Sequence, residues 1–257
     1  MRQDLERLGV EPGCILIVHA SLSAIGWVSG GAQAVVEALL QTIGDTGTLV
    51  MPTHSGAGSD PKHWAAPPVP ESWWQVIRDH TPAFHRDITP TRQMGAVVEC
   101  FRGSRTTLRS SHPLHSMAAN GPLAAEIVAI HALNDAFGDT SPLGRLYDLD
   151  AKVLLLGVGH ANNSSLHLAE TRAEYTDKSV QWRTQGAAIN VDGERSWVEF
   201  QEFDVDSADF ESLGRDLALK TNCETSGHVG AAAARFMAMR GTVDFATQWF
   251  ANNRPTP

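Results

Sequence analysis

Cysteine is scarce in this chain, and its scarcity excludes two classes of protein. The sequence holds three cysteines, Cys14, Cys100 and Cys223, which lie far apart and form no C-x-x-C motif. An odd number of widely spaced thiols predicts neither a disulfide framework nor a cysteine zinc site. We therefore expect a protein of the reducing cytoplasm.

Long apolar runs and an excess of basic residues are also missing. The first ten residues, MRQDLERLGV, are charged and lack the apolar stretch of a secretory signal peptide. No apolar run approaches the length of a membrane span. Lys and Arg number 20 against 29 Asp and Glu, and the net charge of −9 argues against a face that binds nucleic acid. The sequence thus predicts neither a nucleic-acid partner nor a membrane partner.

The composition and patterning that are present indicate a globular α/β domain. The chain has 257 residues, of which 42% are hydrophobic, and we expect a single domain over residues 1–257. Apolar runs at 14–18, 48–52 and 153–159 predict buried strands. Helical spacing over 32–43, between the first two runs, predicts a parallel βαβ crossover.

The last third of the chain is less regular. Residues 186–203 alternate in polarity like a β-hairpin with its turn at Asp192-Gly193. Residues 207–219 and 227–240 have patterns typical of helices.

Residues 164–170, Ser-Ser-Leu-His-Leu-Ala-Glu, are the stretch most indicative of chemistry. They follow an apolar strand, and a serine at 164 or 165 is a typical N-cap. A helix beginning there places His167 and Glu170 on one face, at the strand end where open α/β sheets place their sites. The carboxylate can fix the imidazole tautomer and support its charged form, which suits general base catalysis. The alternative is a histidine that only packs or caps.

Three blocks of sequence resemble the aminoglycoside 3-N-acetyltransferase family, whose members use acetyl-coenzyme A. The blocks are IVHASLS at 17–23 with GDTGTLVMPT at 44–53, then RSSHPLHSMAANGP at 109–122, then SPL at 141–143 leading to LLLGVG at 154–159 and SLHLAE at 165–170. Their order and spacing match the family over almost the whole chain. The resemblance implies an α/β fold, the antibiotic N-acetyltransferase fold, as a three-layer α/β/α sandwich with a mostly parallel central sheet.

The resemblance also implies roles for individual residues. His167 matches the catalytic histidine and Glu170 the acid that follows it, while Ser165 stands where most members have threonine and keeps the hydroxyl. Positions similar to the walls of the cofactor site are His19, Ala20, Ser21, Leu22, Ser23, Gly30, Gly31, Ser116 and Asn120.

The implied reaction is acetyl transfer from acetyl-CoA, a co-substrate, to the 3-amino group of the 2-deoxystreptamine ring of aminoglycoside antibiotics, which gives resistance. His167 would take the amine proton and Glu170 would stabilise the imidazolium. Backbone N–H groups at the helix start, or the Ser165 hydroxyl, would receive the thioester oxyanion. No metal is expected, and the oligomeric state stays open.

An aminoglycoside carries several ammonium groups, so we expect acids around it. Asp204 resembles an aspartate of the aminoglycoside site, although Glu202 or Asp206 fits the same place. Asp60 and Glu174 are further candidates. The alternative for each is a solvated surface acid.

One long segment, residues 53–92, breaks the alternation of strands and helices. It is rich in proline and carries Trp64, Trp73 and Trp74, whose rings need burial or a ligand. Aperiodic segments of this length are typically lids or binding loops. We expect a lid or acceptor-binding segment in which Trp64 stacks on a sugar, unless it packs against the protein.

Three other functions stay open. One is N-acetylation of a different amine. Another is a hydrolase that holds a metal ion with His19, His167, Glu170 and Asp204. The third is a coenzyme A-binding module without catalysis.

Overall fold

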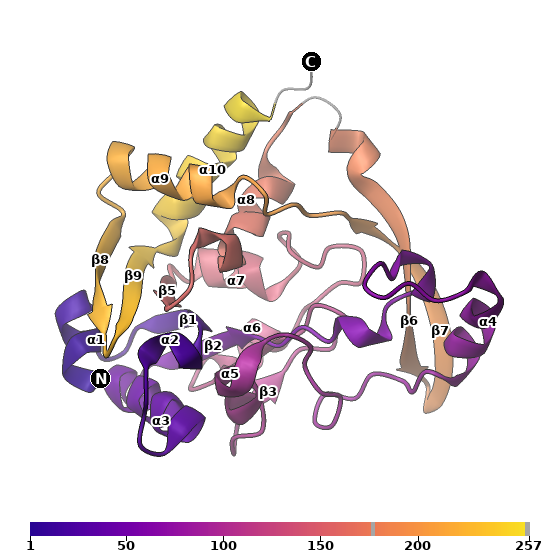
Figure 1. The fold of residues 1–257 in the computed structure, drawn as a ribbon, viewed down its shortest axis with the longest axis horizontal. Helices are drawn as coiled ribbons and strands as arrows, with labels where there is room; N and C mark the ends of the chain where they lie inside the picture. The colour runs from indigo at the N-terminus through magenta and orange to yellow at the C-terminus, as the bar shows by residue number, and fades with distance from the viewer. Residues whose placement is uncertain (176–177, 255–257) are drawn as a thin grey trace.

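A computed structural model describes residues 1–175 and 178–254, which form a seven-stranded mixed sheet and a separate two-stranded sheet (Figure 1). The strands are β1 (Ile15–Ala20), β2 (Thr48–Pro52), β3 (Leu108–Arg109), β4 (Met117–Asn120), β5 (Lys152–Leu156), β6 (Trp182–Val191), β7 (Glu194–Phe203), β8 (Glu224–Val229) and β9 (Ala232–Ala238). The order in the large sheet is β3-β4-β2-β1-β5-β9-β8, while β6 pairs with β7.

The prediction of a mostly parallel sheet is wrong. Within the described residues, β1 pairs in parallel with β2 and with β5. The other four pairings of the sheet, β2 with β4, β3 with β4, β5 with β9 and β8 with β9, are antiparallel. The parallel centre is the crossover that the sequence predicts, and the antiparallel strands lie on either side of it.

The prediction of a helix over residues 227–240 is wrong up to Ala238, and this explains part of the error in sheet type. Alanine has the highest intrinsic helix propensity, yet this alanine-rich stretch forms the β8–β9 hairpin, which pairs with β5. Gly230, with φ of 59°, permits the tight turn. Burial of Ala234 and Met237 in the sheet outweighs the local preference.

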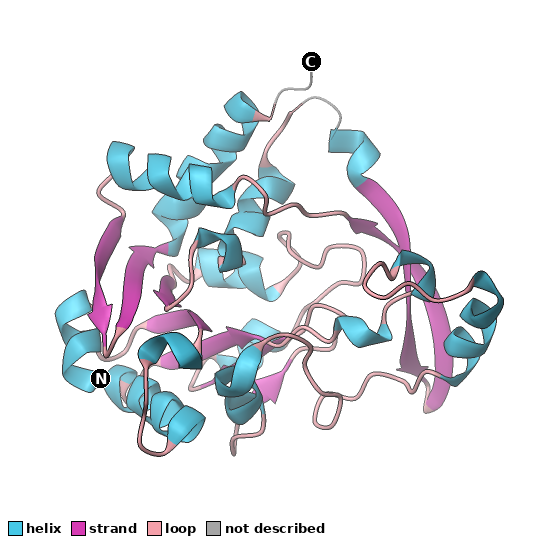
Figure 2. Ribbon diagram, viewed as in Figure 1, coloured by secondary structure: helices cyan, strands magenta, loops and turns pink. Residues whose placement is uncertain are grey.

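Helices cover both faces of the large sheet (Figure 2). The α-helices are α1 (Arg2–Leu8), α2 (Leu22–Ile25), α3 (Gly31–Ile43), α4 (Glu71–His80), α5 (Gly95–Arg102), α6 (Ala124–Val128), α7 (Pro142–Asp148), α8 (Ser165–Arg172), α9 (Phe210–Lys220) and α10 (Met239–Asn253). The short 3-10 turns are η1 (Gly56–Gly58), η2 (Pro61–His63), η3 (His160–Asn162) and η4 (Lys178–Gln181).

Each central strand contributes side chains to two hydrophobic cores, one on each face of the sheet. Ile17 and Val153 pack with α7, α8 and α10 on one face, whereas Leu16 and Leu154 pack with α1, α3 and α5 on the other. Strands buried on both faces are continuous apolar runs, which is why these strands were predictable from sequence.

The predicted hairpin is confirmed and is longer than expected. Asp192 and Gly193 both have positive φ, 52° and 89°, as a two-residue type I′ turn requires. The hairpin lies at the opposite end of the molecule from β8 (Figure 1).

The 53–92 segment packs against this hairpin. The Asp60 N–H donates to Gln185 at 2.9 Å, and Arg195 Nε donates to the Thr81 carbonyl at 2.7 Å. In the described part of the chain, no helix is long and apolar enough to cross a bilayer.

Candidate active site

The candidate site lies where three neighbouring strands end. Since β2, β1 and β5 run in parallel, their carboxyl ends meet at one edge of the sheet. His19 lies near the end of β1, His54 follows β2, and the loop after β5 leads into α8 with His167. Ligands of open α/β sheets bind outside such strand ends.

A cavity of about 500 Å³ opens at this edge. Six residues expected at the site line it: His19, Ala20, Ser21, Leu22, Ser23 and His167. The cavity wall also includes His54, Ala161, Asn162 and Ser164, which are not among the predicted site residues.

The His167 side chain is held for proton transfer. Its Nδ1 donates to Glu170 Oε2 at 2.9 Å, since an ionised carboxylate only accepts. This bond leaves Nε2 as the basic nitrogen. The ring lies between Phe137 and Phe210, with centroid distances of 4.9 and 4.8 Å.

Glu170 is fully buried, and its charge is compensated by three donors. Besides His167, these are Arg254 and the Asp206 N–H, the latter at 2.9 Å. Burial alone lowers the pKa of Arg254, but hydrogen bonds to Asp209 and Glu170 outweigh it and raise the pKa above its ordinary value. The carboxylate is therefore fixed in position.

Two further histidines face the cavity as neutral rings. His19 is 6% exposed, and the Nε2 atoms of both His19 and His54 are buried without a hydrogen-bond partner among residues 1–175 and 178–254. Burial, and secondarily the charge of His167, lowers the pKa of His19 to about 3. Burial and the charge of His115 lower the pKa of His54 well below its ordinary value.

Several residues predicted for the site lie elsewhere or are already engaged. The buried Ser165 hydroxyl donates to Asn163 Oδ1 at 2.6 Å, and the neighbouring Ser164 lines the cavity in its place. Ser116 is buried against Thr53. Neither Ser165 nor Ser116 is part of the cavity wall.

The structure also leaves Asn120, Gly30 and Gly31 outside the cavity wall. Asn120 ends β4 opposite Leu49, away from the carboxyl end of β2, and its amide donates to the Arg105 carbonyl. The two glycines begin α3 with positive φ.

The acids expected to bind the acceptor are paired with basic side chains. Asp60 is fully buried and pairs with Arg78 at 2.8 Å. His115 Nε2 donates to Glu202 at 2.6 Å. Burial alone raises the pKa of Glu202, but His115 and Arg183 lower it to about 2.

The remaining acceptor-side candidates are also engaged. Asp204 pairs with Arg183 at 2.8 Å and is half-exposed. Trp64 donates from Nε1 to the Ser59 hydroxyl at 3.0 Å. The exposed Glu174 pairs with Lys178 at 3.4 Å.

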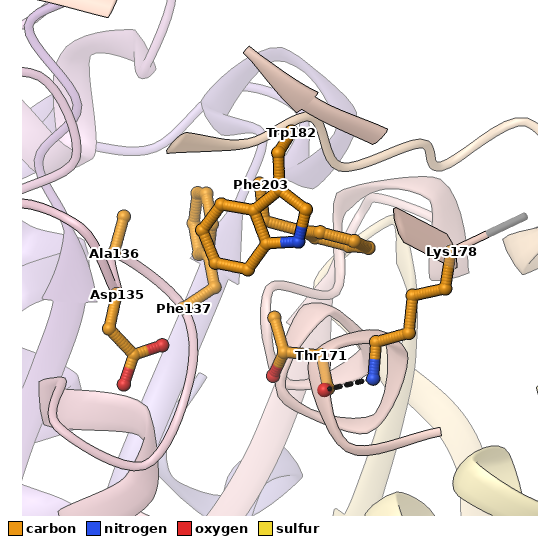
Figure 3. Close-up of a pocket in the computed structure, with 7 residues that line it drawn as sticks. All are labelled: Asp135, Ala136, Phe137, Thr171, Lys178, Trp182 and Phe203. Atoms are coloured by element: carbon orange, nitrogen blue, oxygen red, sulfur yellow. Dashed lines mark hydrogen bonds between the residues drawn. The ribbon is translucent and has the colours of Figure 1, made fainter. Parts of the chain in front are cut away.

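A second, smaller cavity of about 100 Å³ adjoins the site (Figure 3). Trp182, Phe203 and Phe137 line it with their rings, together with Asp135. Because Phe137 also contacts His167, this aromatic cavity lies next to the base.

The four residues named for a metal-dependent hydrolase do not form a metal site among the described residues. Within residues 1–175 and 178–254, no group of three or more His, Cys, Asp or Glu side chains has the geometry to hold a metal ion. Glu170 binds His167 and Arg254, while Asp204 binds Arg183.

An α/β protein with a histidine–carboxylate pair beside a cavity at its strand ends has the features of an enzyme that removes a proton from its substrate. A family model for aminoglycoside 3-N-acetyltransferases matches residues 17–251. The aminoglycoside N(3')-acetyltransferase-like protein YokD of the SPbeta prophage in Bacillus subtilis (strain 168) is 42% identical over 98% of this chain and 91% of its own length. Aminoglycoside N(3)-acetyltransferase IX of Micromonospora chalcea is 32% identical over 97% of this chain and 91% of its own length. The chain therefore belongs to the aminoglycoside 3-N-acetyltransferase family, as the sequence blocks predict.

Solved structures agree with this assignment. The crystal structure of YokD from Bacillus subtilis matches with a TM-score of 0.94 at 41% identity, covering 98% of this chain and 92% of that one. AAC-IIIb in a binary complex with CoASH matches at 0.88 and 26% identity, covering 100% and 96%. AAC-VIa bound to sisomicin matches at 0.88 and 31% identity, covering 100% and 97%.

Proposed function

We propose that this protein transfers the acetyl group of acetyl-CoA to an amine, with His167 as general base. The observation that supports this most is the His167 ring at the cavity, fixed through Nδ1 by a buried carboxylate that Arg254 neutralises. This arrangement supports a base that accepts one proton at Nε2 and returns it.

The reaction proceeds in two stages. The neutral amine forms a bond to the thioester carbonyl carbon while its proton passes to His167 Nε2. The carbon–sulfur bond then breaks, and the leaving thiolate takes the proton from His167. Glu170 stabilises the intervening imidazolium, and such proton transfers contribute about 10²–10⁴-fold to the rate.

Acetyl-CoA would enter along the larger cavity. Its wall includes residues 19–23 and Ser164, whose hydroxyl and backbone groups can bind the pantetheine arm. The relative AAC-IIIb binds CoASH. In this chain the proposed base, His167, lines the larger cavity.

Filling the cavity should weaken coenzyme binding. Ala161 is exposed on η3 and lines the cavity, so Ala161→Trp should raise the KM for acetyl-CoA by about tenfold while the fold stays intact, a loss of roughly 1.4 kcal/mol. Steady-state kinetics and the Tm measure both effects. Ala125→Trp, at an exposed position of α6, is the control. Equal KM values in the two variants would remove the cavity from the coenzyme site.

For the acceptor, we propose the 3-amino group of 2-deoxystreptamine in an aminoglycoside. The relative AAC-VIa binds sisomicin. In this chain the 53–92 segment and the β6–β7 hairpin would form the wall that binds the acceptor. They would belong to the same single domain as the large sheet. The aromatic cavity under Trp182 would hold a sugar ring.

A different amine is the second candidate, and one observation favours it. Asp60 and Glu202 are paired with the basic side chains Arg78, His115 and Arg183. A tricationic or tetracationic acceptor would have to displace these partners or bind elsewhere, whereas a monoamine would not.

An acceptor panel separates the two candidates. We expect thiol release from acetyl-CoA with 2-deoxystreptamine aminoglycosides, and Asp204→Asn should weaken their use because Asp204 is the half-exposed acid of the set. High salt should weaken it further, since exposed charges are screened over about 10 Å at 0.1 M. Turnover of monoamines alone, unaffected by salt, would establish the second candidate instead.

A further inference from the structure

Arg254 contacts the acid of the His167–Glu170 pair from the far end of the described chain. It follows α10 directly and lies outside residues 17–251, the part that matches the family model. Its side chain is 12% exposed and donates from Nη1 to Glu170. A residue that the family resemblance does not cover is therefore bonded to the carboxylate that holds the proposed base.

The two oxygens of Glu170 have different partners. Oε1 accepts hydrogen bonds from the Asp206 N–H at 2.9 Å and from Arg254 Nη1. Oε2 lies 2.9 Å from His167 Nδ1. Because both donors at Oε1 keep their hydrogens, a proton taken up by this carboxyl group would have room only on Oε2, facing the imidazole.

Arg254 is itself held in place by Asp209. Its Nε and Nη2 donate to the two oxygens of that carboxylate at 2.7 and 2.6 Å, and its Cζ lies 4.2 Å from the centroid of the Phe250 ring. This arrangement leaves Nη1 for Glu170. Arginine keeps its charge in proteins, so the guanidinium is a permanent positive charge beside Oε1.

Loss of Arg254 would leave the buried carboxylate with the Asp206 N–H and His167 as its donors. Burial disfavours an uncompensated charge, so the His167–Glu170 pair would take up one proton from water. If the imidazole holds that proton, both of its nitrogens are protonated. If Oε2 holds it, the carboxyl O–H donates to Nδ1 and the ring proton moves to Nε2. In either form Nε2 carries a proton and accepts no other.

The other groups around the pair do not supply a positive charge in place of Arg254. Burial lowers the pKa values of His19 and His54, which are neutral rings, and burial raises the pKa of Tyr175, which is an uncharged phenol. Asp209 is an acid and is partly exposed to water. The charged side chains of α7 and α10, which pack against α8, have other partners: Arg145 pairs with Asp148, Arg240 with Asp150, and Asp244 with the Tyr147 hydroxyl.

We propose that Arg254 is a positioning residue that keeps Nε2 of the base free of a proton. It compensates the charge of Glu170, so that the imidazole holds its single proton on Nδ1 and Nε2 stays available for the amine proton. The effect on rate rests on the proposed acetyl transfer, whereas the effect on the ring does not. Arg254 itself gains and loses no proton.

Arg254→Met removes the charge and keeps an unbranched side chain beside Phe250. A neighbouring charge shifts a titration by about 1–3 pH units, so the acid limb of the kcat profile should move to higher pH by that amount. At a pH on this limb kcat should fall by about tenfold or more, and it should recover as the pH rises. The KM for acetyl-CoA should change little.

Three further variants separate charge from other effects. Arg254→Lys keeps a cation and should restore part of the lost kcat. Arg254→Gln removes the charge but offers an amide N–H to Oε1, and it should behave like Arg254→Met, so the test stands if the methionine variant does not fold. Arg240→Met, at an exposed position of α10, is the matched control and should keep the wild-type profile. Circular dichroism and the Tm identify the folded variants.

Nitrogen-15 NMR of protein labelled at histidine is the direct readout, because protonated and unprotonated ring nitrogens resonate far apart. The signals of His167 are those missing from the spectrum of His167→Gln. At a pH where Nε2 of the wild type is unprotonated, it should be protonated in Arg254→Met and in Arg254→Gln. A role in packing alone would leave this signal unchanged.

The outcomes separate this inference from the function on which its rate effect rests. A wild-type Nε2 signal in the folded neutral variants would overturn the role of Arg254 and leave the His167 assignment standing. A protonated Nε2 in these variants, in a protein that acetylates no amine, would support the role of Arg254 and overturn the proposed function.

Discussion

His167→Ala should lower kcat by at least about a hundredfold, because general base catalysis is worth about 10²–10⁴ in rate. The substitution removes the nitrogen that takes the amine proton. Acetyl-CoA binding should stay close to wild type, since the coenzyme would lie against the walls that follow β1 and β5. Thiol release measures kcat, and calorimetry measures coenzyme affinity.

Glu170→Gln and His228→Ala provide the comparison for this result. Glu170→Gln should be milder, because it removes support for the imidazolium and leaves the proton acceptor in place. His228 is solvent-exposed on β8, and its loss should leave kcat unchanged. If His167→Ala kept more than about a tenth of wild-type kcat, the effect would be below that of any general base, and His167 would not be the base.

Acid should destabilise this protein steeply between pH 6.5 and pH 5. Burial lowers the pKa values of His19 and His131 to about 3 and those of His54 and His112 well below the ordinary value. Below pH 6.5 the unfolded chain therefore binds more protons than the folded one, and stability is lost as the pH falls. Each such histidine contributes about 1.4 kcal/mol per pH unit, so the four together approach about 5 kcal/mol per unit near pH 5.

The neutral form of His131 makes a hydrogen bond at each ring nitrogen. Its Nδ1 bonds to the Ser110 hydroxyl at 2.8 Å, and the same hydroxyl accepts the Met117 N–H. Its Nε2 bonds to the Ala136 carbonyl, which only accepts, at 2.8 Å. In the neutral ring Nε2 carries the proton, and Ser110 donates to Nδ1.

Urea unfolding across this pH range tests the account of the histidines. His131→Gln should reduce the slope by roughly one proton, about 1.4 kcal/mol per pH unit, whereas His228→Gln at the exposed position should not. The interval from pH 6.5 to pH 5 lies above the range in which carboxyl groups titrate. Glu99 and Glu202, whose pKa values are lowered to about 2, also titrate below it. A wild-type slope no steeper than that of one proton would show that these rings are not held neutral.

Local patterns made the centre of the fold and the base predictable. β1, β2 and β5 are apolar because both faces are buried. The spacing of His167 and Glu170 gives contact on any helix that begins at Ser165. These inferences depend on periodicity within a few residues, which a sequence shows directly.

Long-range pairing limited the prediction of the rest of the site. Arg254 reaches Glu170 from the far end of the chain, and no pattern near either residue indicates it. Asp60 looks like a free carboxylate in the sequence, but folding pairs it with Arg78. His54 is different, because its place two residues after a predicted parallel strand was a usable signal for the carboxyl edge of the sheet.

The sheet type was mispredicted for a related physical reason. The run from Ala231 to Ala234 favours helix in isolation, and only its pairing with β5 makes it a strand. Burial that depends on pairing with a distant strand cannot be predicted from a few neighbouring residues.

The most direct test of acetyl transfer is the balance between thiol released and amine acetylated. Wild-type protein is incubated with acetyl-CoA and one accepted amine, the free thiol is counted, and the acceptor is analysed by mass spectrometry and NMR. We predict one acetyl group on an amine nitrogen for each thiol released, with both products lost together in His167→Ala. Thiol release without an acetylated amine, or acetylation that persists in His167→Ala, would contradict the account.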